Sequence, residues 1–202
     1  MRPGQVYSRF EAPGLPPTVL RALRSRDLPK IVEFANTLFE ERGRNPDLGI
    51  ISLDRRVSRS GEKKYLDRVL AGIRKDEEVS VAAFGGGRMV GNCDVKRRTL
   101  YDVMHTGVLG IAIIDGYRGF GLGAAMVRTA LSQARRIGVW LVELQVFSSN
   151  EPAIRLYQRL GFRRIGTVPN KILRGRRHID EALMYIDLRR TDKSMKLPRP
   201  GS

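Results

Sequence analysis

The chain has 202 residues, of which 42% are hydrophobic, enough for one sizeable core, so we expect a single domain. The longest apolar run, residues 107–114, is too short to cross a bilayer, which excludes a membrane span. The amino terminus has no apolar signal core, which excludes an export signal. Both observations indicate a cytoplasmic protein. The formal net charge of +16 and the pI near 10.8 favour polyanionic partners such as nucleic acid, but the arginine pairs are scattered, and a solvated basic surface is the simpler interpretation.

The two ends of the chain differ from the part between them. Residues 1–17 are rich in proline and glycine and have no hydrophobic periodicity, which predicts a flexible leader. Residues 189–202 have the same character, and we expect a basic flexible tail there. Residues 18–188 alternate between β-like and helical segments, so we predict one α/β domain over this range.

The first half of this domain is predicted to contain a strand, two helices and a hairpin. A short strand starts at Thr18, and Asp27 followed by Pro29 opens a helix. The apolar residues of that helix recur on one face: Ile31, Phe34, Ala35 and Leu38. A second helix is predicted over 62–73. Two β-rich runs within 79–95 are joined by a triple glycine, which is typical of a hairpin because glycine accepts positive φ angles.

The only cysteine of the chain, Cys93, lies in the second of these β-rich runs. It has no partner for a disulfide within the chain, and a buried apolar thiol is a better interpretation than a nucleophile. No spacing of ligand side chains predicts a metal site.

A glycine-rich stretch, YRGFGLGAAM, follows a predicted buried strand over 106–114 and precedes a helix that stops at Gly138. The first turn of a helix has unpaired N–H groups and a partial positive charge, so it can bind phosphate oxygens. Gly119, Gly121 and Gly123 leave that approach open, and Arg118 adds a cation. The loop lacks the Lys-Ser/Thr of a Walker loop and the spacing of a dinucleotide fold; it fits Arg-x-x-Gly-x-Gly instead.

The next segment, residues 139–162, is predicted to form a strand followed by a short amphipathic helix. Ser149 or Asn150 provides the cap, Pro152 lies in the first turn, and Gly161 ends the helix. The stretches YRGFGLGAA and SSNEPAIRLYQRLGF together resemble the GNAT superfamily of N-acetyltransferases that use acetyl-coenzyme A. The closing DEALM is similar to the last strand pair of that superfamily, and the resemblance covers about residues 18–188.

The resemblance implies an α/β fold with a mixed β-sheet, splayed at its centre and flanked by helices, with acetyl-CoA entering the gap. The strand before the glycine loop would pair with the pantetheine arm, the loop amides would hold the pyrophosphate, and an asparagine after the splayed strand would help to hold the cofactor. The residues implied are Ile111, Ala112, Ile113, Arg118, Gly119, Phe120, Gly121, Leu122, Gly123, Ala124 and Asn150.

The resemblance also implies catalytic roles. Tyr157 matches the tyrosine that protonates the departing thiolate in many relatives, and a backbone amide near Ile111 would donate to the oxyanion. The position at which many relatives carry a glutamate base is Gln145 here, and an amide cannot take a proton. Glu143 lies on the same strand face as Gln145, so we name Glu143 as the predicted base, acting through a water. A structural ion-paired role for Glu143 is an equal alternative, and His178 is a further candidate.

The acceptor side is predicted from the first helix and the late loops, where the family binds its amines. The residues concerned are Phe39, Glu40, Glu41, Asn170 and His178. The adjacent Glu40 and Glu41 could hold a cationic amine, although a solvated helix face is the simpler interpretation.

Three functions are consistent with the sequence. The basic charge favours acetylation of lysines or amino termini of proteins, because a polycationic small acceptor would be repelled. The second is acetylation of a small amine, and the third is a non-catalytic module that senses acetyl-CoA or associates with nucleic acid. The intact glycine loop argues against a module that binds nucleic acid alone.

Overall fold

The computed structural model describes residues 1–45, 47–49 and 55–189. Its strands are β1 (Val6–Phe10), β2 (Thr18–Arg21), β3 (Glu78–Gly85), β4 (Arg88–Arg97), β5 (Thr106–Ile113), β6 (Leu141–Phe147), β7 (Arg163–Arg174) and β8 (Arg177–Asp187). Its helices are α1 (Leu28–Arg44), α2 (Arg59–Arg74), α3 (Leu122–Arg136) and α4 (Glu151–Arg159), with short 3₁₀ turns at Ser25–Asp27 and Tyr101–Val103.

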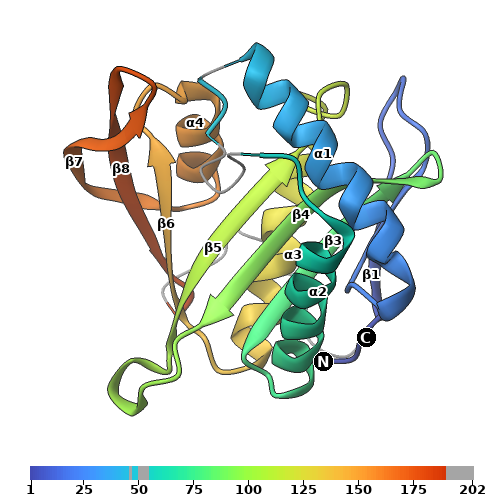
Figure 1. Ribbon diagram of the computed structural model, residues 1–202. Helices are drawn as coiled ribbons and strands as arrows, with labels where there is room; N and C mark the ends of the chain where they lie inside the picture. Colours follow the sequence, from blue (N-terminus) through green and yellow to red (C-terminus); the bar gives the residue numbers. More distant parts are fainter. Residues whose placement is uncertain (46, 50–54, 190–202) are drawn as a thin grey trace.

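The strands form one mixed sheet of order β1-β2-β3-β4-β5-β6-β8-β7. Helices α1 and α2 cover the face of the sheet that is toward the viewer in Figure 1, and α3 lies behind it. The predicted fold class, a mixed sheet flanked by helices, is confirmed. No helix in the described part of the chain is long and apolar enough to cross a membrane.

Local sequence explains most element boundaries. The apolar face predicted for the first helix is buried in α1, and Pro29 lies in its first turn. The triple glycine forms the β3–β4 turn, where Gly86 and Gly87 have φ angles of +57° and +78°. Asn150 caps α4 by accepting a hydrogen bond from the Ala153 N–H at 3.3 Å.

Residues 1–17 are not the unstructured leader that their composition predicted, because they contain β1. This strand pairs antiparallel with β2, with Val6 opposite Arg21 and Phe10 opposite Thr18. The pattern was missed because β1 is an edge strand with largely exposed side chains, of which only Tyr7 and Phe10 are partly buried against the core. At the other end, Arg189 pairs with Asp187 at 2.9 Å. Residues 190–202 of the predicted tail lie outside the described residues.

The sheet opens between β5 and β6. These strands pair in parallel only from Thr106 opposite Leu141 to Val108 opposite Glu143. Beyond Val108, β5 continues against β4 and β6 continues against β8, so the two halves of the sheet diverge (Figure 1). The splayed sheet predicted from the sequence is therefore confirmed.

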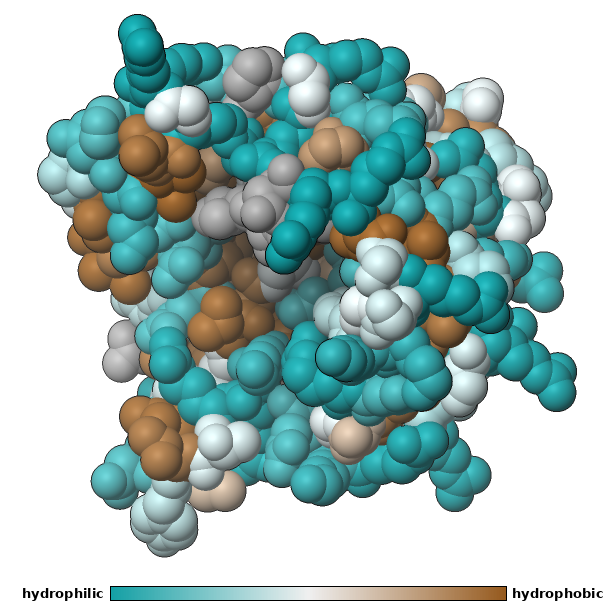
Figure 2. Space-filling view, viewed as in Figure 1, coloured by the Kyte–Doolittle hydropathy of each residue, from teal (hydrophilic) through white to brown (hydrophobic). Residues whose placement is uncertain are grey.

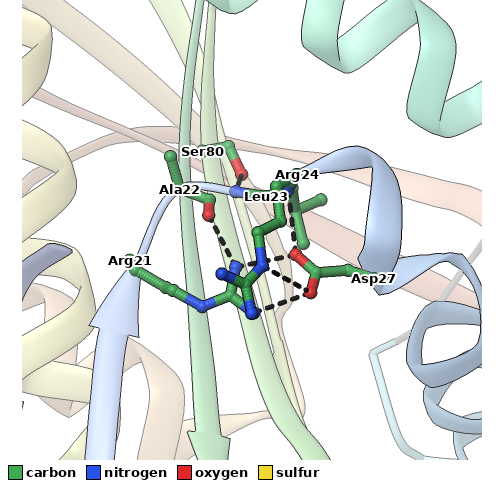
Figure 3. Close-up of polar contacts among 6 residues, drawn as sticks. All are labelled: Arg21, Ala22, Leu23, Arg24, Asp27 and Ser80. Carbon is green, nitrogen blue, oxygen red and sulfur yellow. Dashed lines mark hydrogen bonds and ion pairs between the residues drawn. The ribbon is translucent and has the colours of Figure 1, made fainter. Parts of the chain in front are cut away.

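A buried ion pair joins the start of α1 to β2. Both guanidinium Nη atoms of Arg21 donate to the carboxylate of Asp27, each at 2.7 Å, and the Arg24 N–H donates to the same carboxylate at 2.9 Å (Figure 3). Asp27 is 2% exposed and Arg21 7%. This bidentate geometry pairs two charges whose burial without a partner would cost a large desolvation free energy.

We predict that Asp27→Ala lowers the free energy of unfolding by about 3–5 kcal/mol, because it leaves the Arg21 charge buried without its partner. Urea unfolding measures this. The double variant Arg21→Met/Asp27→Leu is the control and should lose much less stability, since it removes both charges. An equal loss in the two variants would mean that packing, and not the uncompensated charge, accounts for the effect.

Candidate active site

The glycine loop between β5 and α3 leaves the first turn of α3 open. Gly119 and Gly121 have φ angles of +85° and +87°, and Gly121 is the N-cap residue of α3. A Cβ atom built on either glycine would meet no protein atom within 4 Å. These two glycines therefore permit both the left-handed turn and an unobstructed approach to the helix amides, as a pyrophosphate requires.

Gly123 has a packing role that the sequence analysis did not predict. A Cβ atom there would lie 3.3 Å from the Leu156 side chain on α4 and 3.4 Å from the Ile113 side chain on β5. Its missing side chain lets α3 approach these two elements closely. The third glycine of the motif thus serves packing, and the first two keep the helix terminus open.

Arg118 and Glu41, predicted on the cofactor and acceptor sides, are bonded to each other. The Arg118 Nη2 donates to Glu41 Oε2, and its Nε donates to the Ile113 carbonyl at 2.7 Å. The second oxygen of Glu41 accepts the Asp115 N–H at 2.7 Å, and Glu41 is 8% exposed. Glu41 therefore anchors the glycine loop to α1, a structural role that the sequence analysis did not predict.

The edge of β5 that faces the opening carries the residues expected to meet the pantetheine arm. Ile111, Ala112 and Ile113 are half-buried and pair on one side with β4. Within the described residues, no strand pairs with their other side. Figure 2 shows the surface hollowed in the region where Figure 1 draws β5 and β6 apart.

Tyr157 lies on the buried face of α4. Its ring is 6% exposed and meets the Phe162 ring edge-on, with 5.6 Å between centroids. Burial raises the pKa of Tyr157, and the Cys93 thiol raises it further. The phenol therefore keeps its proton throughout the physiological range. Cys93 itself is buried, and burial raises its pKa well above the usual value, so it is not a thiolate nucleophile.

Glu143 lies where β5 and β6 are still paired. It stands opposite Val108, the last residue of β5 that pairs with β6. The Glu143 carboxylate accepts a hydrogen bond from Arg98 Nη2 at 2.9 Å. The next residue on the same strand face, Gln145, is exposed farther along the opening. Glu143 thus occupies the closed end of the splay and is engaged in an ion pair.

The remaining acceptor-side candidates lie in two places. Glu40 on α1 is paired with Arg56, while Phe39 lines a small cavity with Arg42, Gly43 and Arg174 of β7. Asn170 and His178 belong to the β7–β8 hairpin, where both are exposed, and the Asn170 N–H donates to Asp180 Oδ1 at 2.8 Å. Phe39 of α1 and Arg174 of β7 thus line the same cavity, and the acceptor-side role of Phe39 stays a prediction.

The sequence analysis did not predict a cluster of three polar side chains between α2 and β4. Tyr65 of α2 and Asn92 and Asp94 of β4 form a hydrogen-bonded cluster beside Gly110 of β5. Asn92 and Asp94 alternate with buried neighbours, a pattern that also fits the solvent face of an ordinary strand. Only the placement of α2 beside β3 and β4 shows that the two side chains are half-buried against Tyr65.

Comparisons with known proteins agree with this geometry. The model of the Acetyltransferase (GNAT) family matches residues 40–162. The N-alpha-acetyltransferase RimI of Mycobacterium tuberculosis is 35% identical over 86 residues, which are 43% of this chain and 52% of the relative. A streptothricin acetyltransferase of Streptomyces lavendulae is 40% identical over 52 residues, 26% of this chain and 28% of the relative. The matches thus span about half or less of these curated relatives.

Solved structures share the fold over nearly the whole chain. The acetyltransferase yncA of Salmonella typhimurium, a structure with its cofactor acetyl-CoA, superposes with a TM-score of 0.72 at 20% identity. The alignment covers 91% of this chain and 99% of that one. GNAT acetyltransferases use acetyl-CoA as their acetyl donor, and the open α3 terminus and the free β5 edge fit that molecule.

We predict that Gly121→Ala weakens the binding of acetyl-CoA at least tenfold, or about 1.4 kcal/mol, because its Cβ atom enters the open approach and strains a φ of +87°. Calorimetric titration measures the affinity. Gly14→Ala is the matched control, since Gly14 has a φ of +80° and also no atom within 4 Å of its Cβ position. Equal weakening in both variants would show that strain alone, and not the blocked approach, is responsible.

Proposed function

The chain belongs to the Acetyltransferase (GNAT) family, and from this premise we propose that it transfers the acetyl group of acetyl-CoA to a primary amine by direct attack. The proposed acceptor is a lysine or amino-terminal amine of a protein. The observation that carries the proposal is the combination of the unpaired β5 edge and the open glycine loop at the start of α3.

The proposed binding mode for acetyl-CoA uses mostly backbone groups. The amides from residue 118 to residue 124 would hold the pyrophosphate; these are Arg118, Gly119, Phe120, Gly121, Leu122, Gly123 and Ala124. The β5 edge at Ile111 and Ala112 would pair with the pantetheine arm, since the Ile113 carbonyl already accepts from Arg118. Asn150 would contribute from the start of α4.

The thioester supplies an activated acetyl carbonyl with a thiolate leaving group. In the proposed reaction the neutral amine attacks the carbonyl carbon, and a backbone N–H near Ile111 or Ala112 donates to the developing oxyanion. The C–S bond then breaks, and Tyr157 gives its phenolic proton to the coenzyme sulfur. A phenol with a raised pKa suits this role because it remains protonated until the leaving group needs the proton.

A protein acceptor is favoured by two observations. The relative from Mycobacterium tuberculosis is named as an N-alpha-acetyltransferase, and the charge of +16 suits proteins that are associated with polyanions. Acetylation of a small amine is the second candidate, supported by the similarity to streptothricin acetyltransferase.

The acceptor can be identified with acetyl-CoA labelled in the acetyl group. The protein is incubated with a cell lysate divided into macromolecular and small-molecule fractions, and mass spectrometry locates the label. We expect label on protein lysines or amino termini. Label confined to small amines would replace the first candidate with the second, and no protein-dependent label in either fraction would contradict both.

We predict that Tyr157→Phe lowers kcat about 100-fold and leaves acetyl-CoA affinity within twofold, because only the donated proton is lost. Steady-state kinetics and calorimetry measure the two quantities. Tyr101→Phe, at a residue that is 85% exposed, is the control and should leave both unchanged. In the wild-type protein, deprotonation of Tyr157 should not lower the rate at any pH below about 10, the ordinary pKa of tyrosine. Unchanged turnover in Tyr157→Phe would remove this residue from the mechanism.

A further inference from the structure

A carboxylate lies beside the open edge of β5 without a side chain between them. Asp94 of β4 stands opposite Gly110 of β5. A Cβ atom on Gly110 would lie 3.7 Å from each oxygen of the Asp94 carboxylate. Gly110 is exposed although β5 is an interior strand of the sheet, so solvent reaches β5 beside Asp94. A group entering between β5 and β6 can therefore approach Asp94 across Gly110.

The cluster around Asp94 can support both of its protonation states. Asn92 Nδ2 donates to Asp94 Oδ1 and to the Tyr65 hydroxyl, each at 3.2 Å. Asn92 Oδ1 is buried and makes no hydrogen bond within the described residues. An amide can donate to a carboxylate and, turned over, accept from a carboxylic acid. Asn92 can thus stabilise the charged and the neutral form of Asp94.

Burial, together with the charges around Asp94, places its titration near neutrality. Burial raises the pKa of Asp94 to about 7, with a further increase from Glu78 on β3. Arg68 on α2 and Lys96 on β4 act in the opposite direction and are weaker. Tyr65 faces the cluster from α2, and its own pKa is raised mainly by burial, so it remains neutral. A carboxylate that titrates near the working pH is suited to accept and release a proton.

We propose that Asp94 receives the ammonium group of the acceptor amine and takes its proton before attack on the thioester. This inference rests on the proposed acetyl transfer and gives it a base. Asp94 lies beside the residue that precedes Ile111, where the oxyanion donor is expected. Glu143, by contrast, lies at the closed end of the splay and is paired with Arg98.

The proton balance of the reaction is complete with this assignment. One ammonium proton passes to the Asp94 carboxylate, which releases it to solvent after turnover. The amine lone pair then forms the C–N bond while the C–S bond breaks and the sulfur takes the Tyr157 proton. The second proton of the attacking nitrogen replaces the one that Tyr157 gave. The products are the N-acetylated amine, coenzyme A and one released proton.

The test compares the pH dependence of wild-type protein and Asp94→Asn. The acceptors are one pool of peptides with free amino termini and one pool with blocked termini and internal lysines, and the readout is amine-dependent release of coenzyme A. We expect Asp94→Asn to lower kcat/KM at least 100-fold at pH 8 and to remove the rise centred near pH 7, with acetyl-CoA affinity within twofold. Asp67→Asn, which removes an exposed carboxylate of α2, is the matched control and should behave as wild type.

A second variant tests the path over Gly110 without touching the carboxylate. Gly110→Val should lower kcat/KM by hindering access to Asp94, while the rise near pH 7 persists. Gly110→Ala should have a smaller effect, since its Cβ atom reaches only ordinary contact with the carboxylate at 3.7 Å.

Stability provides a check on folding that does not depend on activity. The Asp94 pKa is about 7 in the folded chain, above the ordinary value of about 3.9, so wild-type stability should fall as pH rises between these values. Asp94→Asn lacks this loss. Its melting temperature should exceed that of wild type above pH 7, and the difference should shrink toward pH 4.

The outcomes separate this inference from the proposed function. If wild type acetylates a peptide but Asp94→Asn keeps both its rate and its rise near pH 7, Asp94 is not the base and acetyl transfer stands. If wild type binds acetyl-CoA but shows no amine-dependent release with either pool, both proposals for a protein acceptor are overturned.

Discussion

The loss of backbone pairing between β5 and β6 after Val108 is the constraint on which the rest of the site depends. An interior strand normally has both edges occupied, and an open edge leaves N–H and C=O groups that need partners. Here the neighbours hold the gap apart: β8 pairs along all of β6, and β4 pairs along β5 from Gly107 to Ile113. The opening is thus built into the pairing of the sheet.

Two contacts position the glycine loop at one end of this opening. Glu41 bonds Arg118 and the Asp115 amide, so the loop is tied to α1 from one side. Gly123 lets α3 pack closely against α4 and β5 from the other. Because the loop is held by both faces of the sheet, its amides can be presented in a fixed orientation, and a preorganised site avoids ordering cost when a ligand binds.

The polar cluster beneath α2 lowers the stability of the fold when Asp94 is charged. Burial of Asp94 near Glu78 favours its neutral form, so the charged form reduces stability near neutral pH. The hydrogen bond from Asn92 to Asp94 offsets part of this cost. A buried carboxyl with a perturbed pKa beside a cleft is typical of a functional site, where stability is often lower than the fold would permit.

Local signals in the sequence predicted α1, the β3–β4 hairpin and the start of α4, through helical spacing, the triple glycine after β3 and the cap at Asn150. The splayed sheet has no such local signal and was implied by the resemblance to the GNAT superfamily. The sequence did not predict β1, whose side chains are mostly exposed, nor the pairing of Glu41 with Arg118, nor the half-buried position of Asp94. Those features depend on residues far apart in the chain. The packing of α1 and α2 settles which side chains lie against the sheet, and therefore which carboxylates are paired, buried or within reach of the open edge.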